Sequence, residues 1–137
     1  MQTCEDVLPY ISSKGIKLIT NGGGVNPEGA RDAVFEVAKK LGITGLKIGV
    51  VMGDNILMHI DGLIADGHAM NNMETGQPIS EVKDKLLSAN VYFGAKPIVE
   101  ALQAGADIVI TGRTTDTGLT LAPMIHEFGW SFEDWDK

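Results

Sequence analysis

The chain has 137 residues, of which 44% are hydrophobic and 21% charged, a balance typical of one soluble domain with a buried core. Its net charge of -7 argues against general nucleic-acid binding and against an anionic membrane surface, because both are negatively charged. The single cysteine, Cys4, cannot form an internal disulfide, which fits a reducing compartment. The first residues lack a secretory signal pattern, and no apolar run approaches the roughly 20 residues that span a membrane, so we expect a cytoplasmic protein.

Short apolar runs alternate with helical patterns along the chain. Each predicted helix has apolar residues at helical spacing and ends near a glycine. In chain order the predicted elements are helix 5–14, strand 16–20, helix 27–41, strand 46–52, helix 56–65, an irregular loop at 68–81, a helical turn at 83–87, strand 89–93, helix 96–104, strand 107–111 and helix 117–128. This alternation predicts a parallel sheet with right-handed crossovers.

The fold class is therefore α/β, a three-layer Rossmann-like and mostly parallel sheet with helices on both faces. Nothing marks a second domain, so we expect residues 1–137 to form a single α/β domain. The chain begins in a helix with no preceding strand, and a capping pattern at Ser131 and Asp134 comes just before its end. We therefore expect an incomplete portion of a larger domain.

The predicted strand 107–111 is expected to be buried on both faces, because its centre is an unbroken β-branched run. Arg113 and Asp116 follow its carboxyl end, and open α/β sheets bind ligands at that edge. A guanidinium there suits bidentate recognition of a carboxylate or phosphate. An ion pair between Arg113 and either Asp116 or Asp54 is an equally weighted interpretation, and Asp116 could also cap the next helix.

A glycine-rich turn follows the first predicted strand and leads into a helix. Exposed backbone N–H groups at such a helix start suit a phosphate or carboxylate. The turn lacks the spacing of a dinucleotide fingerprint and the lysine of a P-loop. A tight turn with an ordinary helix cap is the favoured interpretation if the turn is taken alone. Its candidate binding residues are Asn21, Gly22, Gly23, Gly24 and Asn26.

Polar residues also accompany the second and third predicted strands. Asp54 and Asn55 follow the second, where Asp54 could bind a hydroxyl or a metal, or equally cap the next helix. Asn90 and Tyr92 lie around the third, where the buried amide would need partners and the ring is more often half-buried packing. Neither the histidines nor Cys4 show zinc-ligand spacing.

Four runs of this sequence, in order, resemble the acyclic terpene utilisation protein A family. They are ITNGGGVNP at 19–27, SANVYFGA at 88–95, GADIVITGR at 105–113 and HEFGW at 126–130. The resemblance spans nearly the whole chain. Members of that family are much longer, so this chain looks like the middle of their N-terminal domain.

The resemblance implies a role in the breakdown of citronellol- and geraniol-type terpenes through CoA thioesters. It suggests a protein that binds or converts a branched acyl-CoA or carboxylate, for example a C–C lyase acting on a hydroxy-isohexenylglutaryl-CoA type intermediate. Such a lyase would favour a divalent metal that polarises a carbonyl. The resemblance assigns no catalytic residues; from their positions the candidates are Asp54, Arg113 and Asp116. The alternative is a non-catalytic scaffold or assembly subunit, in which a second copy or a partner chain completes the sheet.

Overall fold

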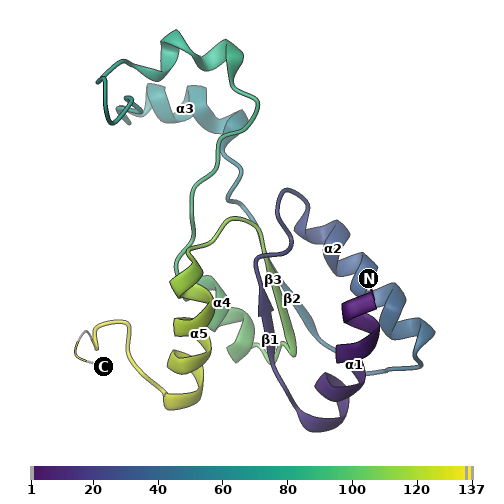
Figure 1. Cartoon of the computed structure of the whole chain (residues 1–137). Helices are drawn as coiled ribbons and strands as arrows, with labels where there is room; N and C mark the ends of the chain where they lie inside the picture. Colours follow the sequence, from purple (N-terminus) through teal and green to yellow (C-terminus); the bar gives the residue numbers. More distant parts are fainter. Residues whose placement is uncertain (1, 135, 137) are drawn as a thin grey trace. The chain divides into compact units, whose positions relative to one another are not determined.

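The computed structural model describes residues 2–134 and 136 (Figure 1). The chain divides into two compact units. Met1–Met52 and Tyr92–Lys137 form the first, here termed the sheet unit, and Gly53–Val91 form the second, the inserted unit. That residues 1–137 make up a single domain of a longer protein stays a prediction.

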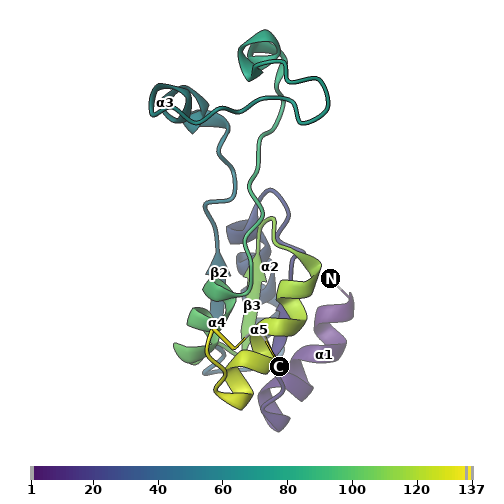
Figure 2. The same cartoon turned by 90° about the vertical axis from the view of Figure 1, so that its left-hand side faces the viewer.

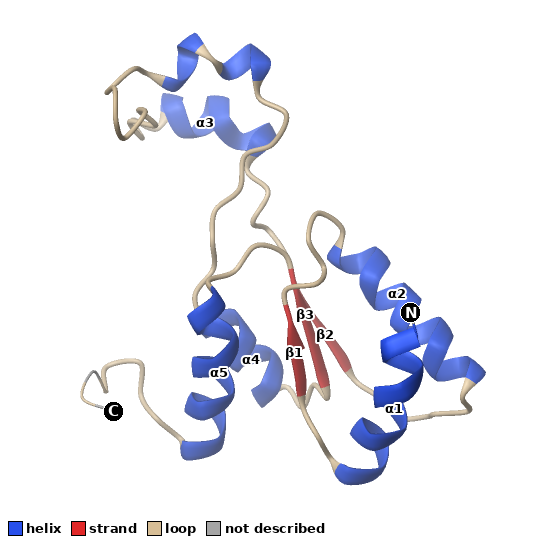
Figure 3. Ribbon diagram, viewed as in Figure 1, coloured by secondary structure: helices blue, strands red, loops and turns tan. Residues whose placement is uncertain are grey.

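The sheet unit contains three parallel strands in the order β1-β3-β2 (Figure 3). They are β1 Leu18–Thr20, β2 Ile48–Val51 and β3 Ile108–Thr111. In the central strand, Val109 is in register with Ile19 of β1 and Gly49 of β2. All four residues of β3 are buried, as the unbroken apolar run predicts for a parallel sheet.

Helices cover both faces of this sheet, two on each side (Figure 1). They are α1 Gln2–Lys14 and α2 Pro27–Lys40 on one face, and α4 Lys96–Gln103 and α5 Asp116–Phe128 on the other. Figure 2 shows α4 and α5 side by side. Alternate residues of β3 enter the two cores: Ile108 and Ile110 pack with α1 and α2, and Val109 packs with α4 and α5. The predicted three-layer α/β fold is confirmed.

The predicted strand 89–93 is wrong. Only isolated bridges occur there, between Asn90 and Asn55 and between Phe93 and Thr114. The apolar part of this run is short, and Tyr92 remains 66% exposed, so it lacks the burial that stabilises a parallel strand. Among residues 2–134 and 136 the sheet therefore has three strands, where the sequence predicted four.

Helix α1 begins at Gln2, earlier than predicted, and Pro9 lies inside the helix, beyond its first turn. A proline there lacks the N–H that would bond to the preceding turn. The Ser13 hydroxyl donates to the Pro9 carbonyl at 2.7 Å.

The inserted unit contains one short α-helix, α3 Ile60–Ala65, and three 3₁₀ turns. The predicted helix 56–65 is present, but its first turn is 3₁₀, with Asn55 Oδ1 accepting from the Leu57 N–H at 3.1 Å. An ion pair between Lys83 and Asp61 joins the third 3₁₀ turn to α3. The 3₁₀ turns are η1 Leu57–His59, η2 Ile79–Glu81 and η3 Lys83–Lys85.

Asp107 joins the amino ends of the three strands. Its carboxylate accepts from the Lys47 backbone N–H at 3.0 Å and from Lys17 Nζ at 3.0 Å. The Lys47 hydrogen bond, helped by Lys17, holds the pKa of Asp107 below its usual value despite partial desolvation.

Replacing Asp107 with asparagine is expected to lower the free energy of unfolding by about 1 kcal/mol at pH 7, because the charge-assisted bonds are weakened. A carboxyl whose pKa is lowered in the folded state stabilises the fold fully above its unfolded pKa of about 4. This contribution is lost as pH falls through the lower folded pKa. Urea unfolding at pH 7 and pH 3 checks both points. Asp32→Asn on the surface of α2 is the control, and an equal effect of the two variants would contradict the assignment.

Candidate functional site

A polar cavity of about 320 Å³ lies in the sheet unit, lined by residues that follow β1 and β3. Residues past the carboxyl ends of parallel strands form the edge where open α/β sheets bind ligands. Four residues singled out from the sequence line this cavity together: Asn21, Tyr92, Arg113 and Asp116. The other lining residues are Gly112, Thr114 and Thr115.

Asn21 and Asp116 approach each other across the cavity. Asn21 Nδ2 donates to Asp116 Oδ1 at 3.4 Å, and both side chains are exposed to solvent. Asp116 is the first residue of α5, and Thr115 occupies the cap position before it. The interpretation of Asp116 as the helix cap therefore does not hold, although its charge in the first turn still stabilises the helix.

The backbone of the glycine-rich turn bonds largely within itself. The Gly22 N–H donates to Thr20 Oγ1 at 3.0 Å, and the Gly24 N–H donates to the Asn21 carbonyl at 3.2 Å. These two groups are therefore engaged by the turn, and their predicted role as anion donors gains no support from the geometry.

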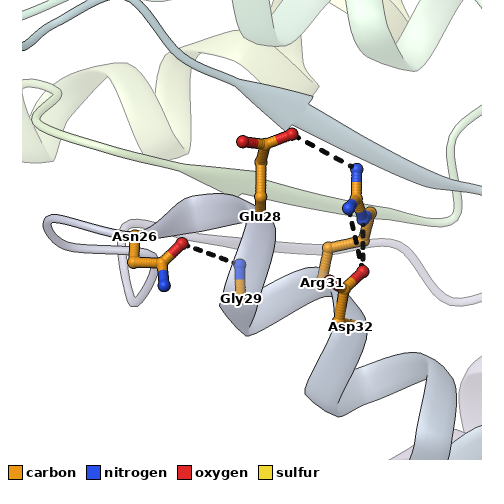
Figure 4. Close-up of polar contacts among 5 residues, drawn as sticks. All are labelled: Asn26, Glu28, Gly29, Arg31 and Asp32. Carbon is orange, nitrogen blue, oxygen red and sulfur yellow. Dashed lines mark hydrogen bonds and ion pairs between the residues drawn. The ribbon is translucent and has the colours of Figure 1, made fainter.

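Asn26 serves as the cap of α2, as the favoured interpretation of the turn taken alone had it (Figure 4). Its Oδ1 accepts from the Gly29 N–H at 2.9 Å. The same end of α2 carries Glu28 and Asp32, which pair with Arg31 at 3.8 and 2.8 Å, and the hydrogen bond that Arg31 donates to Asp32 raises the pKa of Arg31. Two carboxylates beside one guanidinium make this helix start a poor place for an anion.

Gly23 places the turn against the end of the central strand. It is buried, and a Cβ added there would lie 2.6 Å from the Thr111 carbonyl oxygen and 2.9 Å from Pro27 Cα. No larger residue fits without moving backbone. The close approach brings Asn21 to the edge from which Arg113 projects.

Hydrogen bonds hold the backbone around Arg113. Its carbonyl accepts from the Phe93 N–H at 3.2 Å, and the preceding Gly112 N–H donates to the Val51 carbonyl at 3.1 Å. Beyond it, Thr114 Oγ1 donates to the Phe93 carbonyl at 2.8 Å, and the Thr115 N–H donates to the same carbonyl at 2.9 Å. The Arg113 side chain is exposed on this fixed loop.

Three predicted site residues belong to the inserted unit, where two of them meet. Asn90 Nδ2 donates to Asp54 Oδ2 at 2.9 Å, and the Val91 N–H donates to the Asp54 carbonyl at 2.8 Å. Asp54 is only 5% exposed, while Asn55 is exposed and its Oδ1 accepts from the Leu57 N–H, the first residue of η1. Any common action of these residues with Arg113 stays a prediction.

A comparison with known families tests whether this chain belongs to the family that the four sequence runs resemble. A family model described as "Acyclic terpene utilisation family protein AtuA" matches residues 1–137. The chain belongs to this family. Searches of curated proteins and of solved structures found no match. The AtuA family is associated with acyclic terpene utilisation, which supports a role related to catabolism for this chain.

The part of this AtuA family member that the structure describes contains no group of three or more His, Cys, Asp or Glu side chains arranged to hold a metal ion. A divalent metal therefore stays a prediction.

None of the helices in residues 2–134 is long and apolar enough to cross a membrane. Trp130 packs against the core of α4 and α5, and Trp135 lies outside the described residues.

Two residues that position the lining of this cavity were not recognised from the sequence in these roles. Thr114 is 5% exposed, and its hydroxyl hydrogen-bonds the Arg113 loop to the Phe93 carbonyl. In the sequence alone, Thr114 is indistinguishable from any other polar residue of a turn. Gly23 packs against Thr111, and its predicted contact with a ligand stays a prediction. Both roles depend on partners far away in the sequence, so no local pattern could identify them.

Proposed function

We propose that the cavity beside β1 and β3 binds the anionic part of an acyl-CoA or carboxylate during acyclic terpene catabolism. The observation that carries this proposal is the common lining of one cavity by Arg113, Asn21 and Asp116. These side chains offer a guanidinium, an amide and a carboxylate within one small volume. Substrate sites of enzymes typically combine a few such polar groups in a concave surface.

In this proposal, Arg113 pairs with a carboxylate or a CoA phosphate through two parallel hydrogen bonds. The Asn21 amide, oriented by its bond to Asp116, donates to a carbonyl oxygen of the ligand. Asp116 acts as the acid or base, and Tyr92 supplies a hydroxyl at the rim. A C–C lyase step is the reaction class that we propose, with a divalent metal as the group that would polarise the carbonyl.

Replacing Arg113 with alanine is expected to weaken binding of a CoA thioester about tenfold or more, because a charge-assisted pair is lost. Isothermal titration calorimetry of the whole chain with acetyl-CoA measures this. Arg31→Ala is a matched control, since Arg31 is an arginine of the same unit that does not line the cavity. Equal affinity of Arg113→Ala and the natural chain would remove the basis of the proposal.

A partner-binding role is the second candidate, and the sheet itself favours it. Within the described residues, β1 and β2 pair only with β3, so each outer strand keeps one open edge. Open edges can pair with another chain. Sedimentation of the purified chain separates the two candidates: a stable assembly without any thioester binding supports the scaffold.

A further inference from the structure

Asn21 is the only asparagine of the chain that is followed by glycine, and this pair has a chemistry of its own. The backbone nitrogen after an asparagine can attack the carbonyl carbon of its side chain, and glycine obstructs the attack least because it has no Cβ. Asparagine is accordingly one of the heat-sensitive residues of proteins. Asn21 and Gly22 are both exposed, so water reaches the pair. The same asparagine lines the cavity beside β1 and β3.

Hydrogen bonds oppose this attack in the folded chain. The Gly22 N–H, which must lose its proton to become the nucleophile, donates to Thr20 Oγ1 at 3.0 Å. The Asn21 amide, which must turn toward Gly22, donates to Asp116 Oδ1 at 3.4 Å. The Gly24 N–H closes the turn by donating to the Asn21 carbonyl at 3.2 Å. The attacking nitrogen and the attacked side chain are therefore each held by another residue.

We propose that Asn21 is a site of spontaneous deamidation at the edge of the candidate cavity, and that the Thr20 hydroxyl slows the reaction. A bond forms between the Gly22 nitrogen and Asn21 Cγ, and the bond from Cγ to Nδ2 breaks. Nδ2 leaves as ammonia, with the proton that the Gly22 nitrogen gives up. Water then opens the succinimide ring at either carbonyl, which leaves an aspartate or an isoaspartate. The net reaction consumes one water and releases one ammonia.

Deamidation changes the cavity in two ways. It removes the amide donor that lies 3.4 Å from Asp116 and puts a second carboxylate in its place, so that two like charges repel. The isoaspartate product also lengthens the backbone by one carbon, close to Gly23, where even an added Cβ has no room. Both products are expected to weaken the binding of an anion, a consequence that rests on the function proposed above.

Mass spectrometry of the whole chain, incubated for days in neutral buffer and then digested with trypsin, measures the reaction. The tryptic peptide that covers residues 18–31 contains two asparagines, Asn21 and Asn26. Asn26 is an internal control, because the Pro27 nitrogen carries no hydrogen and cannot make the attack. Unfolding in guanidinium chloride is expected to speed the deamidation of Asn21 at least fivefold and to leave Asn26 as an amide.

Replacing Thr20 with valine removes the hydroxyl and keeps a β-branched residue in the strand. Deamidation of Asn21 in this variant is expected to be about fivefold faster than in the natural chain, the factor that corresponds to one ordinary hydrogen bond. Thr20→Ser is the matched control, because it keeps a hydroxyl and is expected to keep the natural rate.

An unchanged rate in Thr20→Val, with circular dichroism showing that both variants fold, overturns the protection by Thr20. If Thr20→Val does not fold, the natural chain decides, and equal rates in its folded and unfolded states overturn the protection. An Asn21 that stays an amide even in the unfolded chain overturns the deamidation site itself.

Asn21→Asp carries the charge of the product and separates this proposal from the proposed function. Acetyl-CoA is expected to bind this variant about tenfold more weakly in isothermal titration calorimetry, because a negative charge is added where an anion binds. If the natural chain binds no acetyl-CoA, the proposed function fails while mass spectrometry still decides the deamidation. Equal binding by the natural chain and Asn21→Asp would overturn the expected effect of deamidation on the cavity.

Discussion

Replacing Gly23 with alanine is expected to lower the free energy of unfolding by about 3 kcal/mol. The added Cβ would lie 2.6 Å from the Thr111 carbonyl oxygen and 2.9 Å from two atoms of Pro27. Two of these three atoms are backbone, so relief requires the turn to move away from the end of β3. Such overpacking typically costs 1–3 kcal/mol and sometimes more, and backbone neighbours put this site at the upper end.

Urea unfolding followed by circular dichroism measures the loss. Gly94→Ala is the matched control, because a Cβ at Gly94 meets nothing within 4 Å, and its effect should stay within about 0.5 kcal/mol. A folded Gly23→Ala variant should also bind acetyl-CoA more weakly, since moving the turn displaces Asn21. Equal stability of the two variants would show that the turn does not press against β3.

Replacing Ile108 with alanine is expected to cost about 3 kcal/mol of unfolding free energy. Ile108 is 1% exposed, lies on the central strand and packs in the core beneath α1 and α2. Truncation removes buried methylene and methyl groups and leaves a cavity that the surrounding helices can only partly fill. The loss should appear as a lower urea midpoint with an unchanged slope.

Ile16→Ala makes the same chemical change at a position that is 46% exposed. Its cost is expected to be about 1 kcal/mol, because a half-exposed side chain has less apolar surface to lose from the core. If the two variants lost the same stability, β3 would not be the buried centre of the sheet.

Local sequence patterns predicted the helices around the sheet well. The start of α2 depends on Asn26 and Pro27, and the end of α5 on Gly129, whose φ is +63°. A capping side chain, and a glycine in the left-handed conformation at a helix end, interact with residues within one turn of the helix. Both can therefore be predicted from residues that are adjacent in the sequence. The start of α1 at Gln2 was predicted too late, because no capping residue or other start signal marks it in the sequence.

The predicted strand 89–93 failed for a reason that lies outside the run. Val91 and Tyr92 have the side chains of a strand, but they are 40% and 66% exposed, and no ladder forms beside them. Strand formation depends on a partner that supplies hydrogen bonds and cover, and a short run cannot specify one. The central strand succeeded because an unbroken β-branched run is typical of burial on both faces.

For the candidate site, the sequence suggested residue types and the fold supplied their neighbours. Arg113 and Asp116 were predicted together because they are close in the chain. Their meeting with Asn21 follows from the parallel pairing of β1 with β3, which brings the turns after both strands to one edge. Thr114 became important only through its bond to Phe93, and Asp54 and Asn90 proved to be a hydrogen-bonded pair in the inserted unit.

The sequence by itself determined the α/β class, the buried central strand, the Asn26 cap of α2, the Gly129 end of α5 and the membership of the AtuA family. These features arise from hydrophobic periodicity and from contacts between near neighbours in the chain. Only the tertiary structure decided that the sheet of the described residues has three strands, that Gly23 presses against Thr111, and that Asn21 approaches Asp116. Each of these depends on groups far apart in the sequence, whose proximity is set by packing of the whole unit.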